Sequence, residues 1–285
     1  MTLSERRRGY PGWRAADAPA RVDPKDATSR AFRISYDDVG KGAPIVLVNG
    51  FTLSGGDWWE TGYVQRLVAL GRRVLIVDPL GHGQSDRPHD PALYRWPDVA
   101  LDIVAAMDAA RVQSATLWGY SRGAALVATA AVEAPERVDA LIVGGGGDLT
   151  QEPDSDVPPA VQGLLGGDWE AYWATPIGST YSEADRGYCE RVNDPQAFGA
   201  AQAGRRLSRY QRDLTRVSAP ALVYVGGNDD PEDSQTTARA LRTECNVLAG
   251  RDHGSAITAV DEVFAFVEPF LALQRSNRGV RPGVK

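Results

Sequence analysis

Residues 116–126, TLWGYSRGAAL, place one serine between two glycines, after a short apolar run and before an alanine-rich segment. The apolar run is typical of a buried strand and the alanine-rich segment of a helix, so Ser121 is predicted to lie on a tight strand-to-helix corner. Gly119 and Gly123 suit such a corner, because the backbone crowds its neighbours there and leaves no room for a Cβ atom. The corner also places Ser121 at the positive end of the following helix, where developing negative charge is stabilised.

Strand and helix patterns alternate on both sides of this corner. Short apolar runs predict strands that are buried on both faces, at residues 44–50, 73–78, 115–118, 138–147, 221–227 and 245–250. Helical patterns follow at 58–71, 96–112, 122–134, 234–244 and 255–274. The alternation predicts an α/β fold, in which helices flank a mostly parallel central sheet. The alternating segment 31–40 is predicted to be an edge strand of that sheet.

The strand pattern lapses in the middle of the chain, and this lapse suggests a domain organisation. Residues 148–216 begin with an acidic, proline-containing link and continue with short helical stretches, so we expect a helical cap inserted before the strand at 221–227. The core is then expected to comprise residues 29–147 and 217–276. Residues 1–28 are expected to form an N-terminal extension, and residues 277–285 a C-terminal tail.

Composition restricts the classes of partner. The 285 residues carry a formal net charge of −6, which argues against nucleic acid as a partner. Cys189 and Cys245 are the only cysteines, and they are too far apart in sequence to suggest a disulfide framework or a zinc site. The arginines near the N-terminus are not followed by an apolar run, and no apolar segment has the length of a membrane span. We therefore expect a cytoplasmic protein that uses no metal or organic cofactor and acts on a small molecule, without a membrane partner.

A serine hydroxyl becomes a good nucleophile only when a base lies within hydrogen-bond reach. Of the histidines at 82, 89 and 253, His253 is the best base by position, because it directly follows the last predicted strand. A carboxylate must then orient the imidazole. Asp229 directly follows the preceding strand and is the first choice, with Asp230 and Asp148 as alternative acids.

Several segments together resemble the α/β-hydrolase superfamily, over about residues 33 to 272. They are VLVNGF at 46–51, DPLGHGQSDRP at 78–88, GYSRG at 119–123, GGNDD at 226–230 and RDHG at 251–254. The order Ser121, Asp229, His253 is also the chain order of this superfamily. The resemblance implies a nucleophile at Ser121 and an oxyanion hole formed by the backbone N–H groups of Phe51 and Arg122.

Each of these residues also has a simpler structural interpretation. Ser121 fits a helix N-cap, His253 a surface turn, and Asp229 a solvated cap. Asn49 stands where the family commonly has histidine, and we expect this difference to alter loop packing only. His82 and Asp78 are expected to organise their loop. The side chain of Arg122 is expected to pair with a local acid, although it could also reach a substrate carboxylate.

Aromatic residues suggest the nature of the substrate pocket. Trp169, Tyr172 and Trp173 have helical spacing and are expected to pack the cap onto the core, yet each is also a candidate pocket residue, as is Trp58. The combined interpretation is a serine hydrolase of the carboxylesterase type that cleaves an ester or related acyl bond of a small, apolar or aromatic substrate through an acyl-enzyme. A C–C bond hydrolase, a lactonase, a perhydrolase or a lyase would use the same residues. A non-catalytic ligand receptor on this scaffold is the more remote alternative.

Overall fold

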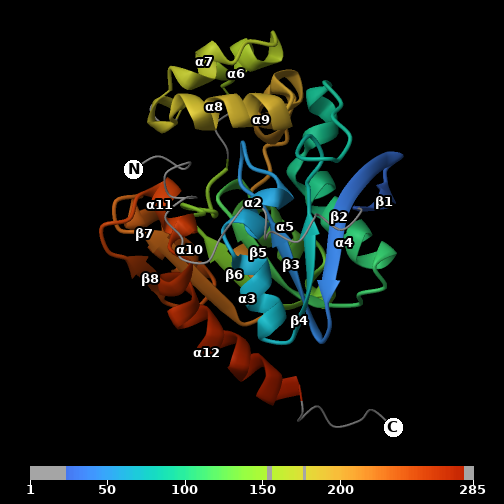
Figure 1. The fold of residues 1–285 in the computed structure, drawn as a ribbon, viewed down its shortest axis with the longest axis vertical. Coiled ribbons are helices and arrows are strands. Elements are labelled where there is room, and N and C mark those ends of the chain that lie inside the picture. The colour runs from blue at the N-terminus through green and yellow to red at the C-terminus, as the bar shows by residue number, and fades with distance from the viewer. Residues whose placement is uncertain (1–23, 153–155, 176–177, 279–285) are drawn as a thin grey trace.

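The computed structural model describes residues 24–152, 156–175 and 178–278. Among these residues, eight strands form one sheet in the order β1-β2-β4-β3-β5-β6-β7-β8 (Figure 1). The strands are β1 (Lys25–Ser29), β2 (Phe32–Gly40), β3 (Ala43–Val48), β4 (Arg72–Val77), β5 (Ala115–Tyr120), β6 (Val138–Gly144), β7 (Ala221–Gly226) and β8 (Cys245–Leu248). β2 pairs antiparallel with both β1 and β4, and the other pairs are parallel. The mostly parallel sheet confirms the predicted α/β fold.

Helices cover both faces of this sheet (Figure 1). The α-helices are α2 (Gly55–Glu60), α3 (Tyr63–Ala69), α4 (Trp96–Ala109), α5 (Arg122–Glu133), α6 (Pro159–Leu165), α7 (Glu170–Trp173), α8 (Glu183–Val192), α9 (Pro195–Leu207), α10 (Pro231–Ala240), α11 (His253–Thr258) and α12 (Val260–Arg278). Short 3-10 helices occur at η1 (Pro91–Tyr94), η2 (Pro135–Arg137), η3 (Gly178–Thr180) and η4 (Leu214–Arg216). No helix in the described part of the chain has the length and apolar character needed to cross a membrane.

The central strands are buried on both faces because successive side chains point to opposite sides of the sheet. In β3, Val46 and Val48 pack into one apolar cluster with helices α4, α5 and α10. Ile45 and Leu47 pack into a second cluster, with α2, α3, α11 and α12. Two apolar layers therefore hold the sheet between them, which is why these strands read as continuous apolar runs rather than as an alternation.

The prediction for the N-terminal part was wrong in two respects. Residues 25–28, assigned to the extension, belong to β1, and β1 rather than β2 is the edge strand. Arg30 and Ala31 connect the two strands with positive φ angles of 50° and 69°. Such a turn is normally marked by Asn-Gly or Asp-Gly, so this hairpin carries no sequence signal. Residues 1–23 and 279–285, the rest of the predicted extension and tail, lie outside the described residues.

Two predicted helices are each divided in the structure. The helical pattern at 58–71 is interrupted at Gly62, whose φ of 91° ends one helix and begins the next, and α2 starts earlier because Ser54 caps it. The final pattern begins at His253 and is interrupted at Ala259.

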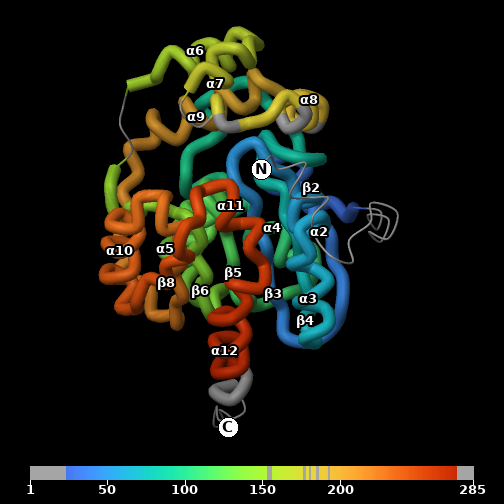
Figure 2. Tube along the Cα trace, turned by 60° about the vertical axis from the view of Figure 1, so that its left-hand side comes forward, coloured from blue at the N-terminus to red at the C-terminus, as the bar shows by residue number. Residues whose placement is uncertain are grey.

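Helices α6 to α9 lie together at one end of the sheet, in both views of the molecule (Figures 1 and 2). They occupy residues 159–207, within the segment in which we expect a cap. Their end of the sheet is the one at which β3, β5, β6 and β8 finish, because residues that follow these strands line a cavity together with residues of α7 and α9. Ligands of open α/β folds bind at this carboxyl end of the strands.

Candidate active site

Ser121 lies on the corner between β5 and α5 with φ 55° and ψ −121°, a conformation that L-residues rarely adopt. The corner is tight on both sides. A Cβ atom on Gly119 would lie 2.2 Å from the carbonyl oxygen of Gly123, and one on Gly123 would lie 2.2 Å from the carbonyl oxygen of Val48. Both glycines are therefore required by close backbone approaches, and the packed corner holds Ser121 in its strained conformation.

Ser121, His253 and Asp229 form one hydrogen-bonded line. The Oγ of Ser121 lies 2.9 Å from Nε2 of His253, and Nδ1 of His253 lies 2.6 Å from Oδ2 of Asp229. Because an ionised carboxylate only accepts hydrogen bonds, Nδ1 carries the proton that is donated to Asp229. In the neutral imidazole Nε2 is then free to accept the Ser121 hydroxyl proton. The arrangement couples a hydroxyl to a base of defined tautomer.

The position of His253 is set by its backbone as well as by its ring. It is the first residue of α11, whose N-cap Asp252 forms a capping box with Ser255. The hydroxyl of Tyr120 donates to the carbonyl oxygen of His253 at 2.5 Å. The sequence analysis missed this contact, and the only signal was that Tyr120 directly precedes Ser121.

The other candidate acids and histidines do not join this line. Asp148 accepts hydrogen bonds from Thr150 and Gln151, and Asp230 is exposed at the start of α10. His89 is half-exposed and lies 3.0 Å from Asp194. Of the acids that were considered, the structure places Asp229 against His253.

Two main-chain amides lie beside Ser121 without an acceptor among the described residues, those of Phe51 and Arg122. The amide of Arg122 is free because it belongs to the first turn of α5. The segment that carries Phe51 is close to the serine, since a Cβ on Gly50 would lie 3.3 Å from the Cβ of Ser121. Both amides therefore stay candidates for the oxyanion hole.

Asn49 holds the segment that leads to Phe51. Its Nδ2 donates to the carbonyl oxygens of Leu53, at 2.7 Å, and of Gly50, at 3.1 Å. The side chain is buried beneath the loop. The side chain of Asn49 thus holds the loop through hydrogen bonds, and the expectation that it does not affect catalysis stays a prediction.

Known proteins show the same fold. A family model described as the alpha/beta hydrolase fold matches residues 43–168. The crystal structure of an enol-lactonase from Burkholderia xenovorans superposes with a TM-score of 0.72 at 20% identity, over 87% of this chain and 100% of the other. The chain has the α/β-hydrolase fold.

Curated proteins that are similar to this chain differ in the chemistry they are named for. A putative non-heme chloroperoxidase from a Synechocystis species is 26% identical over 270 residues, or 85% of this chain and 96% of the relative. A 2-hydroxymuconate semialdehyde hydrolase from a Pseudomonas species is 28% identical over 239 residues, or 80% of this chain and 76% of the relative. The shared fold therefore leaves the reaction to be argued from the site.

Ser121 and His253 open into a cavity of about 440 Å³ between the sheet and helices α7 and α9. Of the aromatic side chains expected in the pocket, only Tyr172 lines this cavity. The other three candidates, Trp58, Trp169 and Trp173, do not line it. Trp58 is buried in the core against Tyr63 and Trp118.

Trp169 and Trp173 stack on each other inside the cap, with ring centroids 5.1 Å apart. Trp173 also donates from Nε1 to Glu190 of α8, and Trp169 packs edge-on against Phe198 of α9. These contacts join helices of the cap to one another, whereas Tyr172 reaches Phe51 of the core. Aromatic residues that were not expected also line the cavity, namely Phe51, Trp96, Tyr120 and Tyr181.

The side chain of Arg122 also differs from the expectation. We expected it to pair with a local acid, but it forms no ion pair or hydrogen bond with any residue that the structure describes. It lines the cavity beside Ser121 and is 7% exposed. Arg205 and Arg212 line the same cavity, as do the acids Asp148 and Glu152, and no ion pair joins either acid to Arg122 among the residues that the structure describes.

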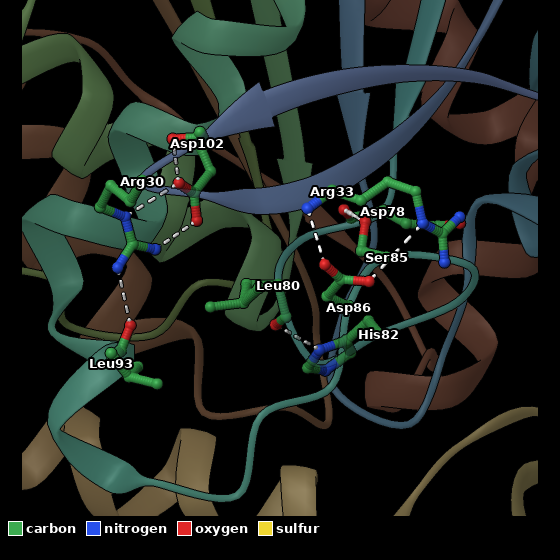
Figure 3. Close-up of polar contacts among 10 residues, drawn as sticks. Arg30, Arg33, Asp78, Leu80, His82, Ser85, Asp86, Leu93 and Asp102 are labelled. Atoms are coloured by element: carbon green, nitrogen blue, oxygen red, sulfur yellow. Dashed lines mark hydrogen bonds and ion pairs between the residues drawn. The ribbon is translucent and has the colours of Figure 1, made fainter.

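His82 lies in the loop that follows β4, where its Nδ1 is 3.3 Å from the main-chain oxygen of Leu80. Figure 3 shows this loop, in which Ser85 donates to the main-chain oxygen of Asp78 and Asp86 accepts from the amide of Arg33. The His82 ring is fully buried, and its centroid lies 4.5 Å from that of Phe198. Burial, and after it the charge of Arg122, hold the pKa of the His82 imidazole well below its usual range.

Substituting His82→Phe should flatten the dependence of stability on pH. As pH falls below about 6.5, the unfolded protein takes up a proton at residue 82 and the folded protein does not. The free energy of unfolding of the native chain should therefore decrease with falling pH, by up to about 1.4 kcal/mol per pH unit from this residue. Urea unfolding of both proteins between about pH 7 and pH 5 checks this. If the free energy of unfolding changed with pH by the same amount in both proteins, His82 would titrate equally in the folded and unfolded states.

In the part of the chain that the structure describes, no group of three or more His, Cys, Asp or Glu side chains is placed to hold a metal ion. Cys189 and Cys245 do not form a disulfide with each other.

Proposed function

We propose that this protein is a serine hydrolase that cleaves an ester or a related acyl bond through an acyl-enzyme. The observation that carries the proposal is the line from Ser121 through His253 to Asp229, at 2.9 Å and 2.6 Å, which opens into a cavity. A hydroxyl, a base and an orienting carboxylate in this order are what nucleophilic acyl transfer requires. The amides of Phe51 and Arg122, which have no acceptor among the described residues, supply the hydrogen-bond donors for the developing oxyanion.

The first half of the proposed reaction forms the acyl-enzyme. Oγ of Ser121 attacks the carbonyl carbon of the substrate while Nε2 of His253 takes the hydroxyl proton. The negative charge that develops on the carbonyl oxygen accepts hydrogen bonds from the amides of Phe51 and Arg122, and such preorganised donors are each worth about 2.7–4 kcal/mol in enzymes where one was removed. When the tetrahedral intermediate collapses, His253 gives its proton to the leaving group.

The second half releases the acid. A water molecule attacks the acyl carbon and gives a proton to Nε2 of His253, and the intermediate then collapses with return of that proton to Oγ of Ser121. Asp229 accepts the Nδ1 hydrogen bond throughout, stabilises the imidazolium and remains ionised. Lactones, and C–C bonds adjacent to a carbonyl, would be attacked by the same groups, so a graded substrate panel decides between these reactions.

Labelling with a fluorophosphonate tests the proposed nucleophile. The probe phosphonylates a serine that is activated by a base, so we expect one equivalent of probe to attach to the native protein, on the peptide that contains Ser121. Mass spectrometry of the digested protein locates the adduct. Protein that stays unlabelled, or that is labelled equally after Ser121→Ala, would contradict the proposal and favour the ligand-receptor alternative.

A further inference from the structure

Three arginines line the same cavity as Ser121 and His253, namely Arg122, Arg205 and Arg212. They come from different parts of the chain. Arg122 begins α5, Arg205 lies in α9 of the cap, and Arg212 lies in the connection from α9 to η4. The folded chain therefore brings three positive charges to a wall beside the candidate nucleophile.

Each of these guanidinium groups has a nitrogen atom that lacks a hydrogen-bond partner among the described residues. Arg122 and Arg212 are 7% and 4% exposed, and atom Nη1 of the first and Nη2 of the second are buried without a hydrogen-bond partner. Arg205 has an unpartnered Nε and no side-chain hydrogen bond to a described residue. Arg212 donates its other groups to Thr129 and to the carbonyl oxygens of Ala125 and Leu149. Leaving buried polar atoms of charged groups unpaired is costly, so a built site of this kind calls for a ligand.

The three arginines share one aromatic ring. Their Cζ atoms lie 4.4 Å (Arg212), 5.9 Å (Arg122) and 5.9 Å (Arg205) from the ring centroid of Trp96. The ring face favours a nearby cation, but it does not neutralise three of them. Burial is the largest cause that lowers the pKa of each guanidinium to about 10, and the charge of Arg205 adds to the lowering at Arg122 and Arg212. All three are nevertheless charged at neutral pH, and their mutual repulsion is relieved when an anion binds between them.

Acidic side chains of the described residues do not neutralise the three arginines. Asp148 and Glu152 also line the cavity. Asp148 is held by Thr150 and Gln151, Glu152 is exposed, and no ion pair joins either of them to the three arginines.

We propose that Arg122, Arg205 and Arg212 form a subsite that binds a carboxylate of the substrate, so that the preferred substrates are anionic acyl compounds. The proposal rests on the proposed function for the reacting bond and adds the class of substrate. A guanidinium matches a carboxylate with two parallel N–H···O bonds, and such charge-assisted bonds are stronger in a cavity shielded from water. Since Arg122 is the residue after Ser121, the bound carboxylate lies within a few carbon atoms of the scissile carbonyl.

Two esters of equal length test this preference. The anionic substrate is para-nitrophenyl hydrogen glutarate, and its neutral counterpart is para-nitrophenyl pentanoate. We expect kcat/KM to favour the glutarate ester, and we expect Arg205→Met to reduce this preference by about 10- to 100-fold, the usual weight of a lost charge-assisted hydrogen bond. Arg205→Lys keeps the positive charge but lacks the two parallel N–H donors of the guanidinium, so the preference for the glutarate ester should fall by an intermediate amount. Arg209→Met is the matched control, because Arg209 is exposed and does not line the cavity.

A binding measurement separates this inference from the proposed reaction. In Ser121→Ala protein, calorimetry with glutarate and with inorganic phosphate reports the subsite without turnover, and circular dichroism verifies that each variant is folded. Glutarate binding that Arg205→Met weakens supports the subsite even if neither ester is hydrolysed, an outcome that would defeat only the proposed function. Ser121-dependent hydrolysis with equal kcat/KM for both esters, unchanged by Arg205→Met, would overturn the subsite alone. Binding of phosphate without glutarate would also overturn the carboxylate assignment.

Discussion

Replacing Ser121 by alanine is expected to lower kcat for para-nitrophenyl ester hydrolysis by about 10⁴- to 10⁶-fold, the range seen when a triad nucleophile is removed. The substitution deletes the only atom of the residue that faces His253, the Oγ at 2.9 Å from Nε2. Because the amides and the cavity remain, a small residual rate above the uncatalysed reaction is expected. Steady-state kinetics with protein of verified mass measures the loss.

Ser114→Ala provides a matched control for this experiment. Ser114 directly precedes β5, Ser121 directly follows it, and the hydroxyl of Ser114 bonds to Asp139 at 2.9 Å. Loss of this partly buried hydrogen bond should cost about 1 kcal/mol of stability and leave kcat unchanged. Turnover by Ser121→Ala at the rate of the native protein would refute the nucleophile and, with it, the proposed reaction.

Substituting Asp229→Asn should lower kcat by about 10³- to 10⁴-fold, because it changes the tautomer of the base. Asparagine can present an N–H group to Nδ1 of His253, which then accepts and leaves the proton on Nε2. A protonated Nε2 cannot take the hydroxyl proton of Ser121. The volume of the side chain is nearly unchanged, so the fold and the affinity for a substrate should persist.

Asp148→Asn and Asp230→Asn test the same chemistry at positions where the structure predicts little effect on kcat. Asp148 interacts with Thr150 and Gln151, and Asp230 is exposed. Both variants should keep kcat within a few-fold of the native value. A loss in Asp148→Asn alone would transfer the acid to the end of β6, and His253 would then need a different rotamer in the working enzyme.

The order of strands and helices could be predicted well because its signals are local. Runs of apolar, β-branched residues bounded by turns locate β3 to β8 within a few residues, and glycines at 119 and 123 indicate the corner that carries Ser121. The hairpin of β1 and β2 escaped prediction because its turn, Arg30–Ala31, holds positive φ angles without the residues that normally favour them. The breaks that divide two of the helices were also not predicted, because a periodic apolar pattern continues across a break of one or two residues.

Side-chain direction within the cap is where prediction failed. Spacing shows that Trp169, Tyr172 and Trp173 share a region of a helix, but it does not show what that region faces. Trp173 contacts Glu190 of α8 and Trp169 contacts Phe198 of α9, so both tryptophans point toward the other cap helices. Tyr172 lines the cavity instead. In the same way, Trp58 fills the core beneath α2.

The sequence by itself determined that a serine, an aspartate and a histidine follow three strands of one parallel sheet, because the carboxyl ends of parallel strands meet at one edge. Only the tertiary structure decided which side chains surround them. The docking of α9 and of the connection after it carries Arg205 and Arg212 to Trp96, where they meet Arg122. The contacts of Arg205 and Arg212 with Trp96 join residues 109 and 116 positions apart in the chain, and local periodicity does not report contacts over such separations.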